Sequence, residues 1–490
     1  MTGGGDQCEI ETHVLIFPCP AQGHVNCMLQ LAELLLLSNI HVTFLNTDHV
    51  HRRLLRFADI NSRLAAYPTL HFETISDGIP ADDPRCGDSI GQQIKQVDLT
   101  ALPQLKKICM EASGKPRFSC IIGDGIFGRL TNQLGQELGI PVVHFRTISA
   151  CCFWACFCAP RLIESNELPI REEEEDLDRM ITSIPGMENL VRCRDLPSFF
   201  RRSHKRPIPL ESIVFETHQS LRAQALILNT FEDLEGPILS QIRNLFPRLY
   251  TLGPLHALLT ARKASKTASS EEKPPPSFAN SLWEIDRTCM TWLDAQPPKS
   301  VIYVSFGSNS TMSRDELMEI WYGLVNSKKR FVWVVRPDMV AEQEGKDLPS
   351  ELVQGTTERG CMVGWAPQQE VLEHVAVGGF MTHSGWNSTL EGVVAGVPMI
   401  CWPYFGDQQI NSRYVSEVWK LGLDMKDTCD RKIVEKMVND LMVERREEFQ
   451  KSTDAMAAGA KASVTDGGSS YSDFDSFIEY LKSLGAGSRN

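Results

Sequence analysis

The sequence predicts an α/β protein with two facing doubly wound domains, each a parallel sheet covered by helices. Three observations support this: the length of 490 residues, the alternation of short apolar strands with helical stretches in both halves, and a polar segment between the halves. A chain of this length is too long for one ordinary core, so two domains of roughly 200 residues each are expected. In such sheets, ligands bind at the carboxyl ends of the strands.

The first half begins with a strand, a loop, a helix and a second strand. Residues 13–17 (HVLIF) and 41–46 (HVTFLN) read as buried parallel strands. Further strands are expected at 120–123, before Thr147, and within 225–235, whereas the second half has them at 301–305, at 331–335 and in the runs CMVG, GGFMT and MICW. We therefore expect an N-terminal domain at 1–256, a surface linker at 257–280 and a C-terminal domain at 281–460.

Composition excludes several classes of partner. A formal net charge of −13 argues against nucleic acid and anionic membranes, which favour a basic face. The LAELLLL run is shorter than the roughly 20 apolar residues of a membrane span, so no membrane insertion is expected. The N-terminus lacks the basic region of a signal peptide. The 15 cysteines are scattered and odd in number, which favours reduced thiols and a cytoplasmic location.

A cysteine-rich run, ACCFWACFCAP, spans residues 150–160. It has neither paired CxxC spacing nor a nearby histidine, so its four cysteines fit small core residues better than a zinc site. Its aromatic side chains, Phe153, Trp154 and Phe157, fit two interpretations equally well: one wall of a substrate pocket, or plain core.

Two residues at strand ends in the first half suggest acid–base chemistry. His24 follows the first strand, and Asp124 follows the strand at 120–123. Strands of one parallel sheet end at the same edge, so both side chains are expected in one cleft. A histidine oriented by a carboxylate can take the proton of a hydroxyl, here that of a bound molecule. Taken alone, Asp124 also fits a helix cap, and His24 fits a cap or a surface position.

The stretch at 365–408 carries a candidate nucleotide site. In GGFMTHSGWNSTLEGVVAG a short strand runs through a small-residue turn into a periodic helix. Free N–H groups and the positive end of the helix dipole favour a phosphate there without a lysine or arginine. His383, Asn387 and Ser388 add donors. An ordinary capped turn would have the same local pattern.

The surroundings of this turn favour a nucleotide-sugar site over an ordinary capped turn. Trp365 offers a flat face for a uracil ring, and Glu391 has oxygens for ribose hydroxyls. The pair Asp407 and Gln408 has acceptors and donors suited to a sugar. Ser308, in a Gly-Ser turn of the second half, is placed to contact the diphosphate from the opposite side.

From Trp365 to Gln408 the sequence resembles, almost residue for residue, the signature box of plant UDP-dependent small-molecule glycosyltransferases of family 1. The likeness covers nearly the whole chain. It implies a GT-B fold, in which two Rossmann-like domains face each other across a cleft and a final helix at 461–490 packs back on the first domain. The QGH motif ending at His24, together with Asp124, matches the family's general base and its partner. Cys27 and Ser384 depart from the pattern, since Pro and Cys are more usual there.

The resemblance also implies which residues bind each substrate. The donor-binding residues would be Thr147, Ser308, Trp365, Ala366, Gln368, His383, Trp386, Asn387, Ser388, Glu391, Asp407 and Gln408. Gln368 and Glu391 would bind ribose, and Trp386 would lie near the sugar. Phe405 joins the three aromatic residues above as a candidate for the acceptor pocket. No metal and no cofactor beyond the co-substrate UDP-glucose are expected, and the protein is expected to be a monomer.

The implied reaction is inverting transfer of glucose from UDP-glucose to a small hydroxylated or carboxylated plant metabolite. HFETISDGIP and YTLGPLHAL most resemble the branch that glucosylates terpenoids, including iridoid aglycones such as 7-deoxyloganetic acid; flavonoid, stilbene and other phenolic acceptors remain open. An NAD-dependent oxidoreductase is disfavoured, because no GxGxxG follows the first strand. A binding protein that keeps the UDP-sugar box without turnover is disfavoured by the intact His24 and Asp124.

Overall fold

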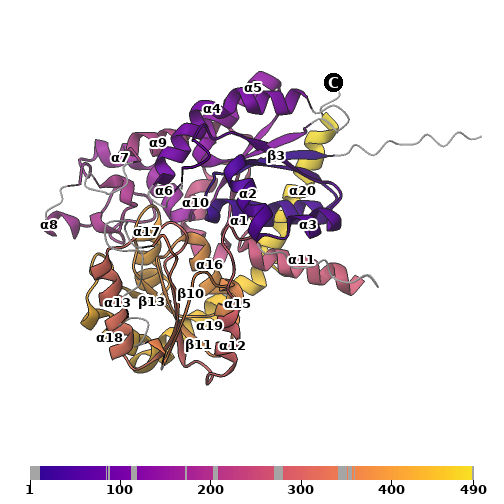
Figure 1. Cartoon of the computed structure of the whole chain (residues 1–490). Coiled ribbons are helices and arrows are strands. Elements are labelled where there is room, and N and C mark those ends of the chain that lie inside the picture. Colours follow the sequence, from indigo (N-terminus) through magenta and orange to yellow (C-terminus); the bar gives the residue numbers. More distant parts are fainter. Residues whose placement is uncertain are drawn as a thin grey trace, which may run out of the picture.

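The computed structural model describes residues 12–83, 85, 89–111, 118–170, 174–201, 208–269, 280–339, 350, 356–357 and 359–487. Two parallel sheets organise these residues, and helices cover both faces of each sheet (Figure 1). Residues 1–11, on which the signal-peptide prediction rests, and residues 270–279 of the expected linker lie outside the described residues.

The first sheet has the strand order β3-β2-β1-β4-β5-β6-β7 and the second β10-β9-β8-β11-β12-β13. The strands are β1 (His13–Phe17), β2 (His41–Thr47), β3 (Leu70–Ile75), β4 (Cys120–Asp124), β5 (Val142–Arg146), β6 (Ala225–Leu228), β7 (Leu249–Thr251), β8 (Val301–Ser305), β9 (Arg330–Val334), β10 (Gly360–Val363), β11 (Val377–Thr382), β12 (Met399–Cys401) and β13 (Gly422–Asp424). The order reverses between β1 and β4 and between β8 and β11. Ligands bind at such switch points in doubly wound sheets.

Helices connect the strands and continue beyond the second sheet. The helices are α1 (Gln22–Leu37), α2 (Asp48–Phe57), α3 (Ile60–Ala66), α4 (Ile90–Met110), α5 (Gly128–Leu138), α6 (Ala150–Phe157), α7 (Ala159–Glu164), α8 (Glu174–Leu177), α9 (Leu210–Gln219), α10 (Glu232–Arg243), α11 (Leu255–Ser269), α12 (Thr288–Asp294), α13 (Arg314–Asn326), α15 (Gln368–Glu373), α16 (Trp386–Val394), α17 (Gln408–Arg413), α18 (Arg431–Asn439), α19 (Arg446–Ser463) and α20 (Ser469–Gly487). Among the described residues, no helix is long and apolar enough to cross a membrane.

Each strand is apolar on both sides because each sheet is covered twice. In β1, Val14 and Ile16 face the layer of α1, α11 and α20, whereas Leu15 and Phe17 face α4 and α5. The second sheet repeats this alternation. In β8, Ile302 faces α13 and α18, and its neighbours face the layer that contains α16. Continuous apolar strands of this kind are typical of parallel sheets.

The structure differs from the expected linker at 257–280, because its first half is helical. Helix α11 packs against α1, with Leu255, Leu258 and Leu259 buried. Lys263 Nζ also lies 2.8 Å from the buried Glu33 carboxylate. The polar composition of ARKASKTASS hides this amphipathic helix, whose apolar face is supplied by the residues just before it.

Strands β3 and β7 were not anticipated. Both are edge strands, where one side of the ladder and part of a face remain open, so β3 (LHFETI) keeps partly exposed positions and lacks a continuous apolar run. Helix α20 crosses from the second domain to pack on β7 of the first (Figure 1). Phe474, Phe477 and Leu481 bury its apolar face there.

Candidate active site

A cavity of about 500 Å³ lies between the carboxyl ends of the two sheets. Its lining comes mainly from the loops after β1, β5, β8, β10, β11 and β12 and from segment 280–287 before α12, so residues far apart in sequence meet in it. The predicted residues that line it are His24, Thr147, Ser308, Trp365, Ala366, Gln368, His383, Trp386, Asn387, Ser388, Glu391, Phe405, Asp407 and Gln408. Asp124 lies directly behind His24 and is 2% exposed.

His24 and Asp124 form a hydrogen-bonded pair at the edge of the cavity. His24 Nδ1 donates to Asp124 Oδ2 at 2.6 Å, and Thr147 Oγ1 lies 2.9 Å from the same nitrogen. Backbone N–H groups of Cys19 and Ile126, both at 3.1 Å, donate to the two carboxylate oxygens of Asp124. These bonds fix the carboxylate, which in turn fixes the imidazole ring, so that in the neutral form Nδ1 carries the proton and Nε2 the lone pair.

The electrostatics of this pair favour its charged form. Burial lowers the pKa of His24, but the charge and hydrogen bond of Asp124 outweigh it, and the net pKa is raised. Burial raises the pKa of Asp124, but His24 and the two backbone donors outweigh it, and the net pKa is lowered. A histidine with a raised pKa is a stronger base once its proton has been lost.

The turn before α16 has the features of an anion site. Gly385 caps α16 without a side-chain hydrogen bond, so the first N–H groups of the helix point into the turn. His383 lies beside it, and its ring packs so closely on Gly307 and Gly385 that a Cβ on either glycine would lie about 2.5 Å away. Burial and the nearby Arg336 lower the pKa of His383 to about 3. His383 is therefore neutral and offers an N–H dipole, not a positive charge.

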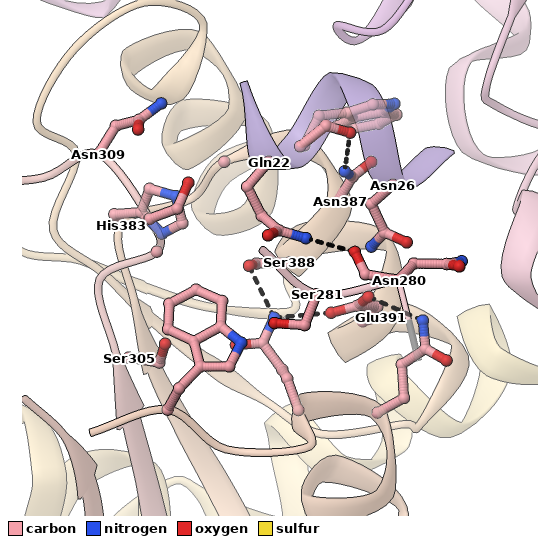
Figure 2. A pocket seen from close by; sticks show the side chains of 18 of the residues that line it. Gln22, Asn26, Asn280, Ser281, Ser305, Asn309, His383, Asn387, Ser388 and Glu391 are labelled. Atoms are coloured by element: carbon pink, nitrogen blue, oxygen red, sulfur yellow. Dashed lines mark hydrogen bonds between the residues drawn. The ribbon is translucent and has the colours of Figure 1, made fainter. Parts of the chain in front are cut away.

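A network of side-chain amides holds Glu391 on the far side of the cavity (Figure 2). Gln368 Nε2 donates to Glu391 Oε2 at 2.6 Å and to Ser388 Oγ at 2.9 Å. Gln369 Nε2 donates to the other carboxylate oxygen at 3.0 Å. Burial outweighs these bonds and raises the pKa of Glu391. Its oxygens keep lone pairs for further donors, such as ribose hydroxyls.

Two predicted donor-site residues already bond across the domains. Trp386 Nε1 donates to the Asn229 carbonyl at 2.8 Å, so its indole N–H is not available to a sugar. Asn387 Nδ2 donates to the Gly23 carbonyl at 2.7 Å. The sequence contains no signal for these bonds, since their partners come from the other half of the chain.

Asp407 and Gln408 lie together at the start of α17, at the edge of the cavity. Burial raises the pKa of Asp407 to about 6, against the opposing effect of Asn411, which donates to it at 2.7 Å. Gln408 Oε1 accepts from the backbone N–H groups of Tyr404 and Phe405 at 2.7 and 2.8 Å. Of the acceptors and donors expected from this pair, the Gln408 oxygen is therefore occupied by the turn, and its Nε2 is left to donate.

Segment 190–201 of the first half supports this turn. The sequence pattern did not predict this support. Ser198 N donates to the Gly406 carbonyl at 3.0 Å, and Gly406 N donates to Ser198 Oγ at 2.7 Å. Gly406 has a φ of 72°, a backbone conformation that glycine adopts without strain. Beneath it, the fully buried Asp195 lies 2.8 Å from Lys426 Nζ of the second domain.

Of the two interpretations open for Phe153, Trp154 and Phe157, the structure supports core. Phe153 is fully buried against Phe246, and Trp154 Nε1 donates to the Pro185 carbonyl at 2.8 Å. Phe157 stacks on Trp154 with ring centroids 5.6 Å apart. None of the three lines the cavity, because their helix α6 packs on α9 and α10. Phe405 does line it.

The cysteines of α6 are buried, and every described cysteine has a free thiol. Within the ranges that the structure describes, no three His, Cys, Asp or Glu side chains are grouped so that they could hold a metal ion. Gln22, Asn26 and Asn280 also line the cavity, although sequence reasoning did not single them out as binding residues (Figure 2).

Comparison with known proteins agrees with this geometry. A family model described as UDP-glucoronosyl and UDP-glucosyl transferase matches residues 227–444. A 7-deoxyloganetic acid glucosyltransferase from Catharanthus roseus is 52% identical over 98% of this chain and 99% of its own length. A myricetin 3-O-rhamnoside 1,2-glucosyltransferase from Crocosmia x crocosmiiflora is 42% identical over 97% of both chains.

Solved structures match over the same extent. The crystal structure of a UDP-glucose:anthocyanidin 3-O-glucosyltransferase in complex with UDP has a TM-score of 0.78 at 25% identity, over 96% of this chain and 99% of that one. Os79 from O. sativa in complex with UDP has a TM-score of 0.76 at 25% identity, over 96% of this chain and 100% of that one. The predicted GT-B fold is thus confirmed. With relatives this similar over almost its whole length, the chain belongs to the UDP-glucoronosyl and UDP-glucosyl transferase family and is a UDP-glycosyltransferase.

Proposed function

We propose that this UDP-glycosyltransferase is an inverting O-glucosyltransferase in which His24 is the general base. The observation that carries the proposal is the His24–Asp124 pair, bonded at 2.6 Å, on the same cavity as the start of α16, which has no side-chain cap. The pair would remove a proton on one side of the cavity, and the helix start would receive negative charge on the other. Such a division of labour suits transfer between a hydroxyl and a sugar diphosphate.

The residues of the cavity account for the proton and the charge that move in this reaction. The acceptor oxygen attacks the anomeric carbon of glucose, its proton passes to His24 Nε2, and the bond from that carbon to the UDP oxygen breaks. Asp124 stabilises the imidazolium that results. The charge left on the diphosphate is met by the N–H groups of α16 and by the neutral His383. Attack from the face opposite the leaving group inverts the anomeric centre.

On the donor side, Trp365 would stack on uracil, and Gln368 with Glu391 would hold ribose hydroxyls. Ser308, Asn387 and Ser388 would contact the diphosphate, whereas Thr147, Asp407 and Gln408 would surround the glucose. Their common position on one cavity supports these roles. Ala366 would contribute backbone groups beside the uracil, and Trp386 would fix the start of α16 through its bond to the first domain.

For the acceptor we propose a hydroxylated terpenoid of the iridoid type. The relative that is 52% identical is named for 7-deoxyloganetic acid, whereas a relative at 42% is named for a flavonoid glycoside, which is the competing assignment. The His24–Asp124 pair favours transfer to a hydroxyl, because an acceptor carboxylate is already ionised at neutral pH and needs no base. Phe405 would line this side of the cavity.

We further propose that the enzyme is a cytoplasmic monomer that works without metal or added cofactor. The free, mostly buried thiols suit a reducing compartment. Helix dipoles and neutral donors would take the charge-neutralising role that a divalent cation has in other transferases. Turnover that survives exhaustive chelation would support the metal-free reaction, and restoration by added Mg²⁺ would contradict it.

One screen tests the proposed reaction. The protein is incubated with UDP-glucose and a panel of iridoid, monoterpenoid, flavonoid and stilbene acceptors, and products are read by mass and by the anomeric configuration of the glucoside. A β-glucoside of an iridoid formed with the highest kcat/KM is expected. An α-glucoside would contradict inversion, and preference for phenols would overturn the acceptor assignment alone.

A further inference from the structure

We infer that Trp283 is a positioning residue for the donor nucleotide: it supports Trp365 from outside the cavity and ties it to the first domain through Arg53. The inference rests on the proposed role of Trp365 as the platform for uracil. It adds a residue from outside the signature stretch, and a mechanical link from donor binding to the domain that carries the base.

The rings of Trp283 and Trp365 are in direct contact. Their ring centroids lie 5.9 Å apart with an interplanar angle of 27°, which is an offset stack. Three residues after Trp283, Asp286 N donates to the Trp365 carbonyl at 2.8 Å, so the two chain segments are also joined by their backbones. Trp365 lines the cavity and Trp283 does not, so Trp283 supports the platform without occupying the place of a ligand.

The first domain contacts Trp283 and restricts its position. Arg53, on α2, places its guanidinium 4.4 Å from the centre of the Trp283 ring, within the range of a cation–π contact. The same side chain donates through Nε to the Leu282 carbonyl at 2.8 Å. Arg53 therefore fixes both the ring and the backbone that carries it. Trp283 is half-buried between the domains in consequence.

The segment that contains Trp283 is also bound to α1, the helix that carries His24. Gln22, two residues before His24, donates through Nε2 to the Asn280 carbonyl at 2.9 Å (Figure 2). Its Oε1 accepts from Leu282 N at 2.6 Å. The fully buried Arg63 of α3 donates to the Asn280 side chain. Segment 280–283 is thus bound to α1, α2 and α3 before it reaches Trp365. None of these bonds involves the His24 side chain.

Because Trp283 already restricts the Trp365 side chain, less conformational entropy is lost when a uracil ring stacks on Trp365. Loss of Trp283 should therefore weaken donor binding and leave the chemical step alone, because nothing at His24 or the sugar changes. In Trp283→Ala we expect UDP to bind about 2- to 13-fold more weakly, the range that one aromatic stack supports. KM for UDP-glucose should rise by the same factor, and kcat at saturating donor should stay within about twofold.

The experiment measures UDP binding to the whole protein by calorimetry, together with steady-state kinetics. Trp283→Phe keeps an aromatic surface and should recover most of the affinity. Arg53→Met keeps length but not charge and should have an intermediate effect. Trp292→Ala is the matched control: Trp292 is a half-buried tryptophan on α12 that does not line the cavity, and its loss should not change UDP affinity.

A double-mutant cycle with Trp365→Ala separates the inference from the proposed function. If Trp365→Ala weakens UDP and Trp283→Ala adds little to it, the two act as one unit and the inference stands. If Trp365→Ala weakens UDP but Trp283→Ala alone does not, the inference is overturned and the donor site remains. Fully additive effects would also overturn it. If Trp365→Ala leaves UDP affinity unchanged, the proposed uracil platform itself is wrong, and the inference falls with it.

Discussion

Asn387 Nδ2 donates to the Gly23 carbonyl at 2.7 Å, joining the first turn of α16 to the first turn of α1 across the two domains. Gly23 precedes the proposed base, and Asn387 lies in the turn proposed for the diphosphate. This hydrogen bond therefore contributes to setting the distance between His24, which accepts the proton, and the turn before α16, which receives the leaving charge. A bond that positions reacting groups in this way contributes to catalysis although it does not contact the acceptor.

Asn387→Ala removes this bond and one proposed diphosphate donor. We expect kcat/KM for UDP-glucose to fall about 10- to 100-fold, because a buried carbonyl loses its partner and the register of the domains loosens. Parental kinetics in Asn387→Ala would contradict the coupling.

His24→Ala should lower kcat by roughly two to four orders of magnitude, since only the base is lost. UDP should still bind with parental affinity, as measured by calorimetry. The acceptor must be an alcohol, because an acidic phenol needs less help from a base. Turnover of an alcohol that survives nearly intact would remove His24 from the mechanism.

Asp124→Asn tests the cause of the raised pKa of His24. The base works when neutral, so kcat/KM of the parent should fall as pH drops through that raised pKa. Asparagine removes the charge that raises it, and the acidic limb of the profile should move to lower pH while the plateau falls. A limb that stays in place would show that another group titrates.

The sequence predicted which residues form the site better than it predicted the hydrogen bonds between them. The strand ends that carry His24 and Asp124 are continuous apolar runs, and one parallel sheet leaves little choice about where they meet. The signature stretch likewise predicted the turn at Gly385. The bond from Trp386 to Asn229 could not be read, because it depends on how two separately folded sheets face each other.

Local polarity misled the sequence prediction elsewhere. Helix α11 was expected to be linker because its exposed face is rich in Lys, Ser and Thr, although Leu258 is fully buried against α1. Phe153 and Trp154 fitted core and pocket equally well, because a buried aromatic looks the same in sequence whichever it lines. Only the packing of α6 on α9 and α10 decides between them.

Asp195 should make stability depend on acid pH. Burial raises the pKa of this carboxyl, but the charge of Lys426 and bonds from Arg192 outweigh it and hold the pKa at about 2. A fall from the ordinary 3.8 to about 2 corresponds to about 2 kcal/mol of stability. Because the folded-state pKa is depressed, this stability is present above the unfolded value near pH 4 and is lost as pH falls toward 2.

Asp195→Asn should therefore lower the free energy of unfolding at pH 7 by about 2 kcal/mol, measured by denaturant titration. The difference from the parent should shrink below about pH 4, where the parent carboxylate begins to be protonated. Asp178→Asn is the control: Asp178 is 54% exposed in its ion pairs, and its loss should cost less than about 1 kcal/mol. A difference that stays constant down to pH 3 would contradict the assignment.

Gln408 allows the sugar assignment to be tested apart from folding. Its Oε1 accepts from Tyr404 N and Phe405 N, so Gln408→Ala would lose the brace of the turn as well as any sugar contact. Gln408→Glu keeps an oxygen for both backbone donors and replaces the free Nε2 by an acceptor that cannot donate to a hydroxyl. We expect Gln408→Glu to melt near the parental temperature and to bind UDP about as well as the parent.

Transfer from UDP-glucose should nevertheless fall by about 5- to 150-fold in Gln408→Glu, since one hydrogen bond in a desolvated site is worth about 1–3 kcal/mol. The ratio of kcat/KM for UDP-glucose to that for UDP-galactose should narrow, because the lost donor would no longer distinguish their hydroxyls. Gln408→Ala should show the same narrowing plus a lower melting temperature. An unchanged sugar ratio in Gln408→Glu would leave Gln408 a brace for the Tyr404–Phe405 turn, and the discrimination between sugars would have to come from Asp407 or Thr147.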